Sequence, residues 1–556
     1  MTSAPSFPDK VPVLIVGGGP VGLSAAALLG HYGIECLVLE ADPSWCEGSR
    51  AICISRRSQE ILGWVGAEQA LLAKGLPWVG GRSYFRGTEV LHFEMPSEPA
   101  QRFAPMINIQ QYYIEQFAHA AALRAGRADI RWSARVRAVR SQDSGVQVDC
   151  QTAGGHVRTV SADWVLACDG GRSTVREQLG LQLEGKQYEG RYVIVDIEQD
   201  TRREVERLAW FDPPSNPGST ILMHRQPDNV WRIDYQVAEH EDAAQAVKPE
   251  NVLPRVQAHL DMIGETAPWK PLWISIYNAK CLTLPSYRSG RVLFAGDAAH
   301  LVPIFGVRGL NSGLDDAGNL AWKLALVQQG RAGEALLDSY SVERGLATRE
   351  NIAYGAKSTQ FMAPPHRGFA LMREAALRLA LESPGVRSLI NPRQTSPVEY
   401  VDSPLNEPDI GGTLSSGTFR GGARAGMPAP EARLRILQSG LPSAGHLTAL
   451  FGGNFVALYF SDNPNLPLSL VPLNESPLVA HALPGVAALR LVRVATHGNP
   501  DERTVVDELG QAWLRYDAAD GTLYLIRPDG YVMGRWRAAS AANISHALRR
   551  VLGDRR

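Results

Sequence analysis

The apolar residues of this chain follow two patterns, short continuous runs and alternation. Short runs stand within residues 13–16, 36–39, 164–168 and 291–295. Runs of this length, bounded by glycine or charged residues, are typical of strands buried on both faces of a parallel sheet. Between residues 181 and 284 apolar and polar positions alternate, which predicts an antiparallel sheet. The patterns therefore indicate an α/β chain with two kinds of sheet.

The first run leads into GGGPVG at residues 17–22, which fits G-x-G-x-x-G. An alanine- and leucine-rich helix is predicted from about Pro20 to Tyr32, and the second run ends at Glu40. In this motif the glycines permit a tight turn, close approach of a diphosphate, and close packing of helix on strand. The helix N-terminus offers free N–H groups to phosphates, and an acid about twenty residues on suits a ribose hydroxyl. This order of features favours dinucleotide binding over a structural turn.

Two later strand ends also carry an acid. One strand ends at Asp169-Gly170 before a helix predicted at 173–180, and another ends at Gly296-Asp297 before a long helix predicted at 309–329. Asp169 could simply cap its helix, but a carboxylate beside free N–H groups also suits the hydroxyls and phosphates of a dinucleotide. The free N–H groups of the long helix would point at a negatively polarised group.

The remaining pattern predicts helices, hairpins and one irregular stretch. Residues 396–427 are rich in Gly, Pro and Ser and indicate a linker or lid. The other predicted elements are helices at 55–65, 105–124, 331–347, 348–387 and 540–552, a hairpin at 129–149, and strands at 454–460, 488–494, 504–508, 522–527 and 531–536.

Composition narrows the class of protein. The chain has 556 residues, 45% of them hydrophobic and 20% charged, with a net charge of −1. This composition is ordinary for a globular protein. The net charge is too small to create an electrostatic field that would attract nucleic acid. The first residues lack a signal-peptide pattern, and no apolar stretch is long enough to span a bilayer. Six cysteines without C-x-x-C or zinc spacing predict free thiols, no metal site and a cytoplasmic location.

Together the three strand ends are more specific than any one of them. GGGPVG, CDGGRSTVR at 168–176 and GDAAHLVPIFGVRGLNSGLDDAGNLAWKL from Gly296 resemble the three fingerprints of the single-component, class A flavoprotein aromatic hydroxylases. The resemblance covers roughly residues 11 to 390. The tail, with LIRPDGYVMGRW at 525–536, resembles the thioredoxin-like domain of the phenol hydroxylase branch. The most similar subgroup is the 3-(3-hydroxyphenyl)propionate and polyketide hydroxylase type.

The resemblance implies a Rossmann-like FAD-binding domain, an inserted antiparallel β-sheet substrate domain and a C-terminal thioredoxin-like α/β domain. The expected FAD-binding domain comprises residues 1–75, 101–180 and 285–395. The substrate domain comprises 76–100 and 181–284, a linker covers 396–427, and the last domain covers 428–556. The tail has no cysteine after Cys281, so it cannot perform dithiol chemistry, and a packing or dimerisation role is expected.

The resemblance also implies which residues contact non-covalent FAD. The glycine loop and the start of the helix that follows it would hold the diphosphate. Glu40 would bind the adenosine ribose, and Asp297 would bind the ribityl chain. Pro303 would lie beside the reactive face of the flavin, and backbone N–H groups at 309–311 would face the pyrimidine ring. The full set of expected FAD contacts is Gly17, Gly19, Pro20, Val21, Gly22, Glu40, Ala41, Arg50, Gln111, Asp169, Gly170, Asp297, Pro303, Gly309, Leu310 and Asn311.

The activity implied is hydroxylation of a phenolic or related aromatic. NADPH or NADH would reduce FAD, O₂ would form a C4a-hydroperoxide, and an electron-rich ring would attack it. His224, Tyr192 and Tyr235 on the inserted sheet are candidates for assisting phenol deprotonation, and Arg232 for stabilising a phenolate. A Baeyer–Villiger or epoxidising enzyme of the same fold and a flavin-dependent dehydrogenase or reductase stay open alternatives. The halogenase signature W-x-W-x-I-P is absent, and a homodimer stays open.

Overall fold

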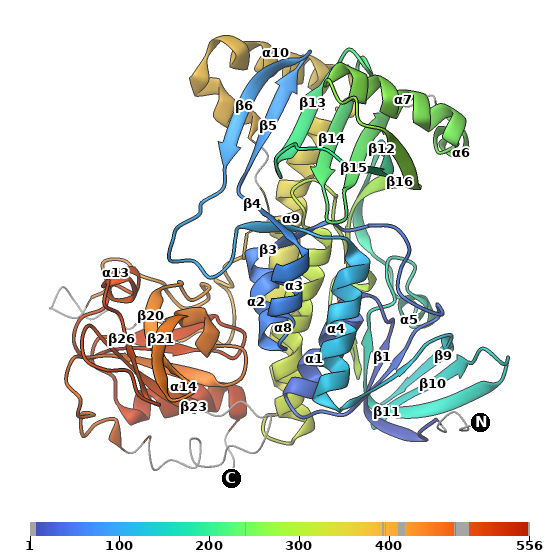
Figure 1. The fold of residues 1–556 in the computed structure, drawn as a ribbon. Helices are drawn as coiled ribbons and strands as arrows, with labels where there is room; N and C mark the ends of the chain where they lie inside the picture. The colour runs from blue at the N-terminus through green and yellow to red at the C-terminus, as the bar shows by residue number, and fades with distance from the viewer. Residues whose placement is uncertain are drawn as a thin grey trace.

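The computed structural model describes residues 7–238, 241–391, 394, 396–409, 418–471, 473 and 489–553, with the backbone alone at 188 and 189. Figure 1 shows a helix-covered sheet in the middle, a second sheet above it, and a C-terminal body at the lower left. The α/β class predicted from the sequence is confirmed.

The first sheet is built around β1 (Lys10–Val16), which runs parallel to β2 (Cys36–Leu39) on one side and β11 (Val157–Ala167) on the other. β8 (Ala128–Arg131) extends it beside β2, and β18 (Val292–Phe294) extends it beside β11, both in parallel. Strand order reverses at β1, so the carboxyl ends of these strands open on one crevice, where open α/β sheets bind ligands.

Helices and small strands surround this sheet. α1 is almost wholly buried because it is rich in Ala and Leu, and α4 and α8 pack against it. The hairpin predicted at 129–149 is confirmed by β9 and β10, which pair antiparallel. The bounds are α1 (Pro20–His31), α2 (Arg56–Trp64), α3 (Glu68–Lys74), α4 (Gln111–Ala125), α5 (Thr174–Gln178), α8 (Gly309–Gln328), α9 (Asp338–Met362), β3 (Cys53–Ser55), β4 (Leu76–Trp78), β7 (Met106–Asn108), β9 (Arg135–Gln142), β10 (Gly145–Gln151) and β17 (Arg288–Ser289).

The second sheet has the order β19-β16-β12-β15-β14-β13-β5-β6 and is antiparallel except where β13 meets β5. The antiparallel sheet predicted for this region is therefore confirmed. One face packs on α7, and α10 packs on the β6 edge (Figure 1). The bounds are β5 (Gly80–Phe85), β6 (Thr88–Glu94), β12 (Glu184–Gln199), β13 (Arg207–Phe211), β14 (Thr220–Arg225), β15 (Val230–Val237), α6 (Ala243–Ala246), α7 (Pro249–Met262), β16 (Trp269–Thr283), β19 (His300–Leu301) and α10 (Arg367–Glu382).

The C-terminal sheet has the order β21-β20-β24-β23-β22-β25-β26. Its centre is the parallel pair β22 and β23, flanked by the antiparallel hairpin of β25 and β26, as a thioredoxin-like domain requires. Ser540 caps the last helix with a reciprocal bond to Asn543. The bounds are β20 (Arg433–Gln438), β21 (Leu441–His446), β22 (Phe455–Phe460), β23 (Leu489–Ala495), β24 (Thr504–Val506), α13 (Gln511–Arg515), β25 (Thr522–Ile526), β26 (Val532–Trp536) and α14 (Ala541–Leu552).

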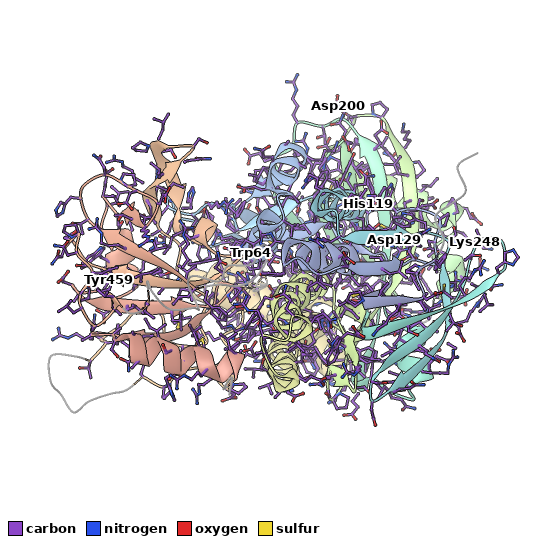
Figure 2. All side chains as sticks on the ribbon, turned by 90° about the horizontal axis from the view of Figure 1, so that it is seen from below. Trp64, His119, Asp129, Asp200, Lys248 and Tyr459 are labelled. Atoms are coloured by element: carbon purple, nitrogen blue, oxygen red, sulfur yellow. The ribbon has the colours of Figure 1, made fainter. Side chains whose placement is uncertain are left out.

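The C-terminal body joins the rest of the chain through buried charges. Arg527 donates to both carboxylate oxygens of Glu343 at 2.6 and 2.9 Å, and its Nε donates to Asp529 at 2.9 Å. Lys323 also donates to Glu343, at 2.7 Å. Nearby, Trp64 packs against Gly452 at the boundary between the bodies (Figure 2). The RPDG sequence of the tail is therefore the segment that anchors it to α8 and α9.

Some predicted boundaries are wrong. The helix predicted from residue 105 begins only at Gln111, because residues 106–108 form β7 between two other short strands. The boundary predicted at residue 347 lies inside one helix, α9, and the helix predicted at 348–387 is divided between the end of α9 and α10. Within the predicted linker, residues 410–417 lie outside the described residues. None of the helices in the described part of the chain has the length and apolarity needed to cross a bilayer.

Candidate functional site

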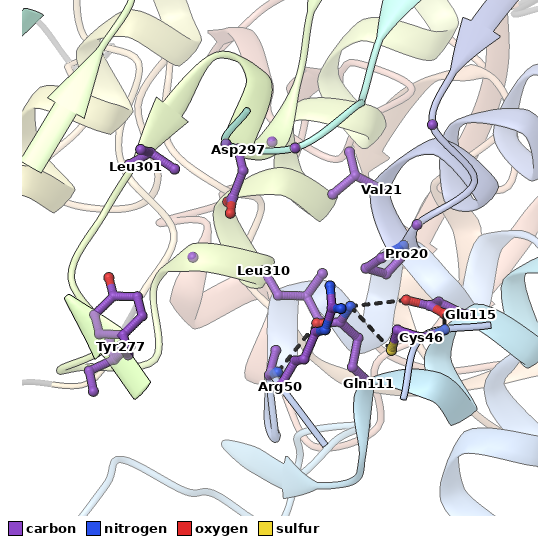
Figure 3. Close-up of a pocket in the computed structure, with 18 of the residues that line it drawn as sticks. Pro20, Val21, Cys46, Arg50, Gln111, Glu115, Tyr277, Asp297, Leu301 and Leu310 are labelled. Atoms are coloured by element: carbon purple, nitrogen blue, oxygen red, sulfur yellow. Dashed lines mark hydrogen bonds between the residues drawn. The ribbon is translucent and has the colours of Figure 1, made fainter. Parts of the chain in front are cut away.

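One cavity of about 990 Å³ lies between the first sheet and the second. Three strand-end segments line it, 16–21, 168–174 and 295–297, together with the start of α8 and one face of the second sheet. Its volume is at the upper end of the roughly 300–1,000 Å³ usual for ligand pockets. Segments far apart in the sequence therefore meet at a single site with room for a large ligand (Figure 3).

The glycine loop shows a separate reason for each of its three motif glycines. Gly17 has φ of 106°, and a Cβ there would lie 2.4 Å from the carbonyl oxygen of Cys168. A Cβ on Gly22 would lie 2.0 Å from the carbonyl oxygen of Gly17. At Gly19, the N-cap of α1, no described atom comes within 4 Å of such a Cβ. Gly17 thus allows the tight turn, Gly22 lets α1 pack closely on the end of β1, and Gly19 leaves the backbone open toward the cavity.

Glu40 lies at the end of β2 beside this loop. Its Oε2 accepts from the Gly18 N–H at 2.5 Å, and its Oε1 accepts from the Asp42 N–H at 2.8 Å. These two bonds fix the carboxylate at the cavity wall, next to Ala41, which also lines it. A fixed carboxylate at this position can accept hydrogen bonds from the hydroxyls of a sugar.

Two aspartates reach the cavity from the other strand ends. Asp169 Oδ2 accepts from the Val175 N–H at 3.1 Å, so this residue does cap α5, whereas its Oδ1 is buried and has no hydrogen-bond partner among the described residues. Asp297 follows β18, and its side chain points into the cavity (Figure 3). Burial raises the pKa of both carboxyl groups. An unpaired carboxylate oxygen in such a place suits a ligand hydroxyl.

The start of α8 closes another side of the cavity. Gly309, Leu310 and Asn311 all line it, and the N–H groups of the first helical turn have no partner within the helix. The Asn311 side chain accepts from the Ser55 N–H at 2.8 Å and donates to the Cys53 carbonyl at 3.0 Å. The side chain therefore fixes the helix start on β3, and only the backbone is offered to the cavity.

Arg50 and Gln111 approach from the loop before β3 and from the first turn of α4. Gln111 donates to Glu115 at 2.9 Å and to the Cys46 sulfur at 3.6 Å (Figure 3). Arg50 has φ of 37° and lines the cavity near Gln111. Fourteen of the sixteen residues predicted to contact FAD line this one cavity; Gly22 and Pro303 do not.

The second sheet presents two rows of side chains to the cavity. Strand register places Trp273, Asp196, Arg232, His224 and Arg207 side by side in the first row. The second row holds Ser275, Ile194, Asp234, Leu222 and Ala209. All of them except Asp196 and Ala209 line the cavity. The rows form a partly apolar wall that carries a few charges.

The structure separates the predicted pocket candidates on this sheet. His224 and Arg232 line the cavity, but Tyr192 and Tyr235 do not. Tyr235 points to the opposite face with Trp231 and Ile233, because side chains alternate along β15. Tyr192 donates from its hydroxyl to the Met362 carbonyl at 3.0 Å. Pro303 also lies off the cavity wall, with its ring against Gly355.

The chemistry of the two candidates that do line the cavity is limited. Burial and the nearby Arg207 and Arg232 lower the pKa of His224 to about 3, so its ring is neutral at physiological pH. The guanidinium of Arg232 contacts Asp196 at 3.2 Å and also donates to the Arg50 carbonyl and the Ser49 hydroxyl. Arg232 therefore fixes the segment that holds Arg50, and each of its three guanidinium nitrogens already donates a hydrogen bond within the protein.

Sequence reasoning missed Arg207 and Asp234. Arg207 is 4% exposed and lines the cavity, and its guanidinium makes no hydrogen bond or ion pair within the described part of the chain. Asp234 is 6% exposed, and its Oδ1 has no hydrogen-bond partner among the described residues. The signal was present in the sequence, because Asp234 stands two residues after Arg232 on the same face of an alternating strand.

Comparison with known proteins agrees with this geometry. Residues 10–353 match the sequence family described as FAD binding domain. The chain is 28% identical over 548 residues to a 3-(3-hydroxy-phenyl)propionate/3-hydroxycinnamic acid hydroxylase of Mycobacterium sp. (strain KMS), covering 97% of this chain and 91% of that one. It is 32% identical over 381 residues, 66% of each chain, to the protein of the same name from Klebsiella pneumoniae (strain 342).

Solved structures share the whole architecture. The flavin-dependent monooxygenase PieE, in complex with FAD and substrate, superposes with a TM-score of 0.79 at 22% identity and covers 99% of this chain and 100% of its own. Aklavinone-11 hydroxylase, in a ternary complex with FAD and aklavinone, gives a TM-score of 0.75 at 22% identity with the same coverage. At these identities the likeness shows a common fold, including the C-terminal body.

Proposed function

This chain belongs to the FAD binding domain family, and from that membership we propose that it is an FAD-dependent monooxygenase that uses NAD(P)H and O₂ to hydroxylate a phenolic or related aromatic. The observation that carries the proposal is the single cavity shared by three strand ends and the partly apolar face of the second sheet. One side of the cavity offers what a dinucleotide needs, and the other offers a wall for an aromatic ring.

The residues present fit FAD. Gly19 leaves the backbone open at the N-terminus of α1, where N–H groups and the helix dipole favour a diphosphate. We propose that Glu40 holds the adenosine ribose and that Asp169 and Asp297 accept from other hydroxyls of the cofactor. We propose that the backbone at 309–311 donates to the electron-rich edge of the flavin ring. When bound, FAD reduced by NAD(P)H supplies the oxygen-activating chemistry.

The protein must then orient the aromatic ring and exclude water. Trp273, Ile194 and Leu222 give the second sheet an apolar surface, and Arg207 and Asp234 interrupt it. The relatives named above carry 3-(3-hydroxyphenyl)propionate in their names, so we propose a phenol of this class as substrate. We also propose a cytoplasmic location, because all six cysteines are free thiols, and a homodimer as the assembly.

Substrate-dependent turnover tests this function. Purified protein reconstituted with FAD is expected to oxidise NADPH or NADH faster when the right phenol is present, and to consume O₂ in proportion. Mass spectrometry under ¹⁸O₂ is expected to show a product with one labelled oxygen on the ring. Ester formation by oxygen insertion would indicate a Baeyer–Villiger enzyme instead. A protein that binds FAD but shows no aromatic-stimulated NAD(P)H oxidation across a panel of phenols would contradict the proposal.

A further inference from the structure

The second-sheet wall of the cavity holds one carboxylate oxygen without a hydrogen-bond partner and one guanidinium without a hydrogen bond or ion pair among the described residues. On the first row, Asp196 accepts from the Ser49 hydroxyl at 2.5 Å and from Arg232 at 3.2 Å. On the second row, Asp234 lies 3.9 Å from the Arg232 Nε, beyond hydrogen-bond distance. Its Oδ1 is buried and without a hydrogen-bond partner in the described part of the chain. Two aspartates on neighbouring strands thus differ, because Asp196 is hydrogen-bonded within the protein, whereas the Asp234 carboxylate has only the longer ion pair with Arg232 among the described contacts.

Both aspartates are buried, so the difference between their hydrogen bonds calls for a physical reason. Leaving a buried carboxylate oxygen without a hydrogen-bond partner is costly, so native proteins keep few such oxygens without a use. Arg207 presents the same case with the opposite charge, since it is buried at the cavity and its guanidinium has no partner among the described residues. An acceptor and a cation facing one cavity match the two needs of a phenol that loses its proton.

Building on the proposed function, we infer that Asp234 is the group that accepts the proton of the substrate hydroxyl, and that Arg207 stabilises the resulting oxyanion. The O–H bond of the phenol breaks, its proton binds to the carboxylate of Asp234, and the electron pair stays on the phenolate oxygen. No oxidant or further reactant takes part in this step. The phenolate makes the ring more electron-rich, which favours attack on an electrophilic oxygen.

The surrounding charges fit this role. Asp234 is faced by Arg232 on its own strand, by Asp196 on β12, Arg207 on β13, His224 on β14 and Cys53 on β3. Burial, opposed by Arg232, raises the pKa of Asp234 to about 7. His224 at about 3, Cys53 at about 12 and Arg207 at about 10 have pKa values far from neutrality. A carboxyl group near 7 is well matched to proton transfer at physiological pH.

The test compares Asp234→Asn with wild type, using 3-(3-hydroxyphenyl)propionate as the probe. The pKa of Asp234 sets the direction in which kcat/KM changes with pH. The carboxyl group must be deprotonated to accept a proton, so the wild-type kcat/KM is expected to rise with pH through about 7. The asparagine side chain of Asp234→Asn has the same shape as aspartate but cannot accept the proton. We expect its kcat/KM for product formation to fall about 100-fold, which is typical for the loss of a general base. The rise of kcat/KM with pH, which is the acid limb of the profile, should disappear. FAD content and flavin spectrum should be unchanged.

Two further variants make the result decisive. Asp200→Asn, at an exposed position after β12, is the matched control and should keep the wild-type limb. Arg207→Met removes a cation that lowers the pKa of Asp234, so its acid limb should move to higher pH by roughly one unit. If Asp234→Asn does not retain FAD, the pH profile of Arg207→Met still tests whether Asp234 accepts the proton.

An Asp234→Asn enzyme with an intact acid limb and kcat/KM within threefold of wild type would overturn the inference, as would an unmoved limb in Arg207→Met. Failure of the proposed function looks different. In that case the wild-type protein itself would form no hydroxylated product from the probe or from any other phenol.

Discussion

Replacing Gly22 by alanine is expected to weaken FAD binding about tenfold or more. The new Cβ would lie 2.0 Å from the carbonyl oxygen of Gly17 and 3.3 Å from the Cβ of Cys168, so α1 must move away from β1. Overpacking of this kind costs about 1–3 kcal/mol, and the displaced part is the helix end proposed to face the diphosphate. Fluorescence titration of the apoprotein with FAD measures the dissociation constant.

Gly63→Ala is the matched control for this variant. Gly63 also lies in a helix, α2, but its Cβ would meet only ordinary contacts at 3.6 Å and beyond. Alanine favours a helix interior over glycine by about 1 kcal/mol, so this change should leave FAD affinity intact. Unchanged affinity in Gly22→Ala, measured beside this control, would show that the helix–strand contact does not position the cofactor.

Replacing Arg527 by methionine is expected to destabilise the protein by about 3–5 kcal/mol, because buried Asp529 loses its ion-pair partner and buried Glu343 keeps only Lys323 of its two cations. Arg527 and Glu343 are both fully buried between the C-terminal body and α9. The lost contact lies between bodies, so limited proteolysis is expected to release the C-terminal body first. Urea unfolding, followed by fluorescence and by proteolysis, measures the effect.

Arg378→Met serves as the comparison. Arg378 pairs with Glu374 on the surface of α10 with 60% of its side chain exposed, and exposed pairs of this kind contribute little to stability. If Arg527→Met unfolded at the same urea concentration as Arg378→Met, the buried pair would not be what joins the C-terminal body to the rest.

The sequence predicts that the three strand ends meet at one cavity, because the determinants of this arrangement are local. A glycine that allows a turn, an acid at the end of a strand and a helix start each occupy a few consecutive residues, and parallel strands bring their ends to one edge. Glu40, Asp169 and Asp297 therefore reach the same cavity from strand ends that lie far apart along the chain.

The substrate side is harder to predict because it depends on which face of a strand a residue takes and on what its neighbours use. Tyr235 and Asp234 are adjacent in sequence, yet one enters the core under α7 and the other the cavity. Arg232 and Arg207 are both buried on the cavity face, but only Arg232 donates hydrogen bonds to Asp196 and Ser49. Strand pairing sets these differences, and no short motif records it.

We propose above all that the three strand ends bind one extended FAD whose ring faces the wall of the second sheet. A crystal structure of the protein reconstituted with FAD tests it most directly. We expect a single FAD with its diphosphate at Gly19 and its hydroxyls at Glu40, Asp169 and Asp297. Its ring should lie between the start of α8 and the face that carries Arg207 and Asp234. An FAD bound elsewhere, or one that contacts the glycine loop but neither Asp169 nor Asp297, would contradict it.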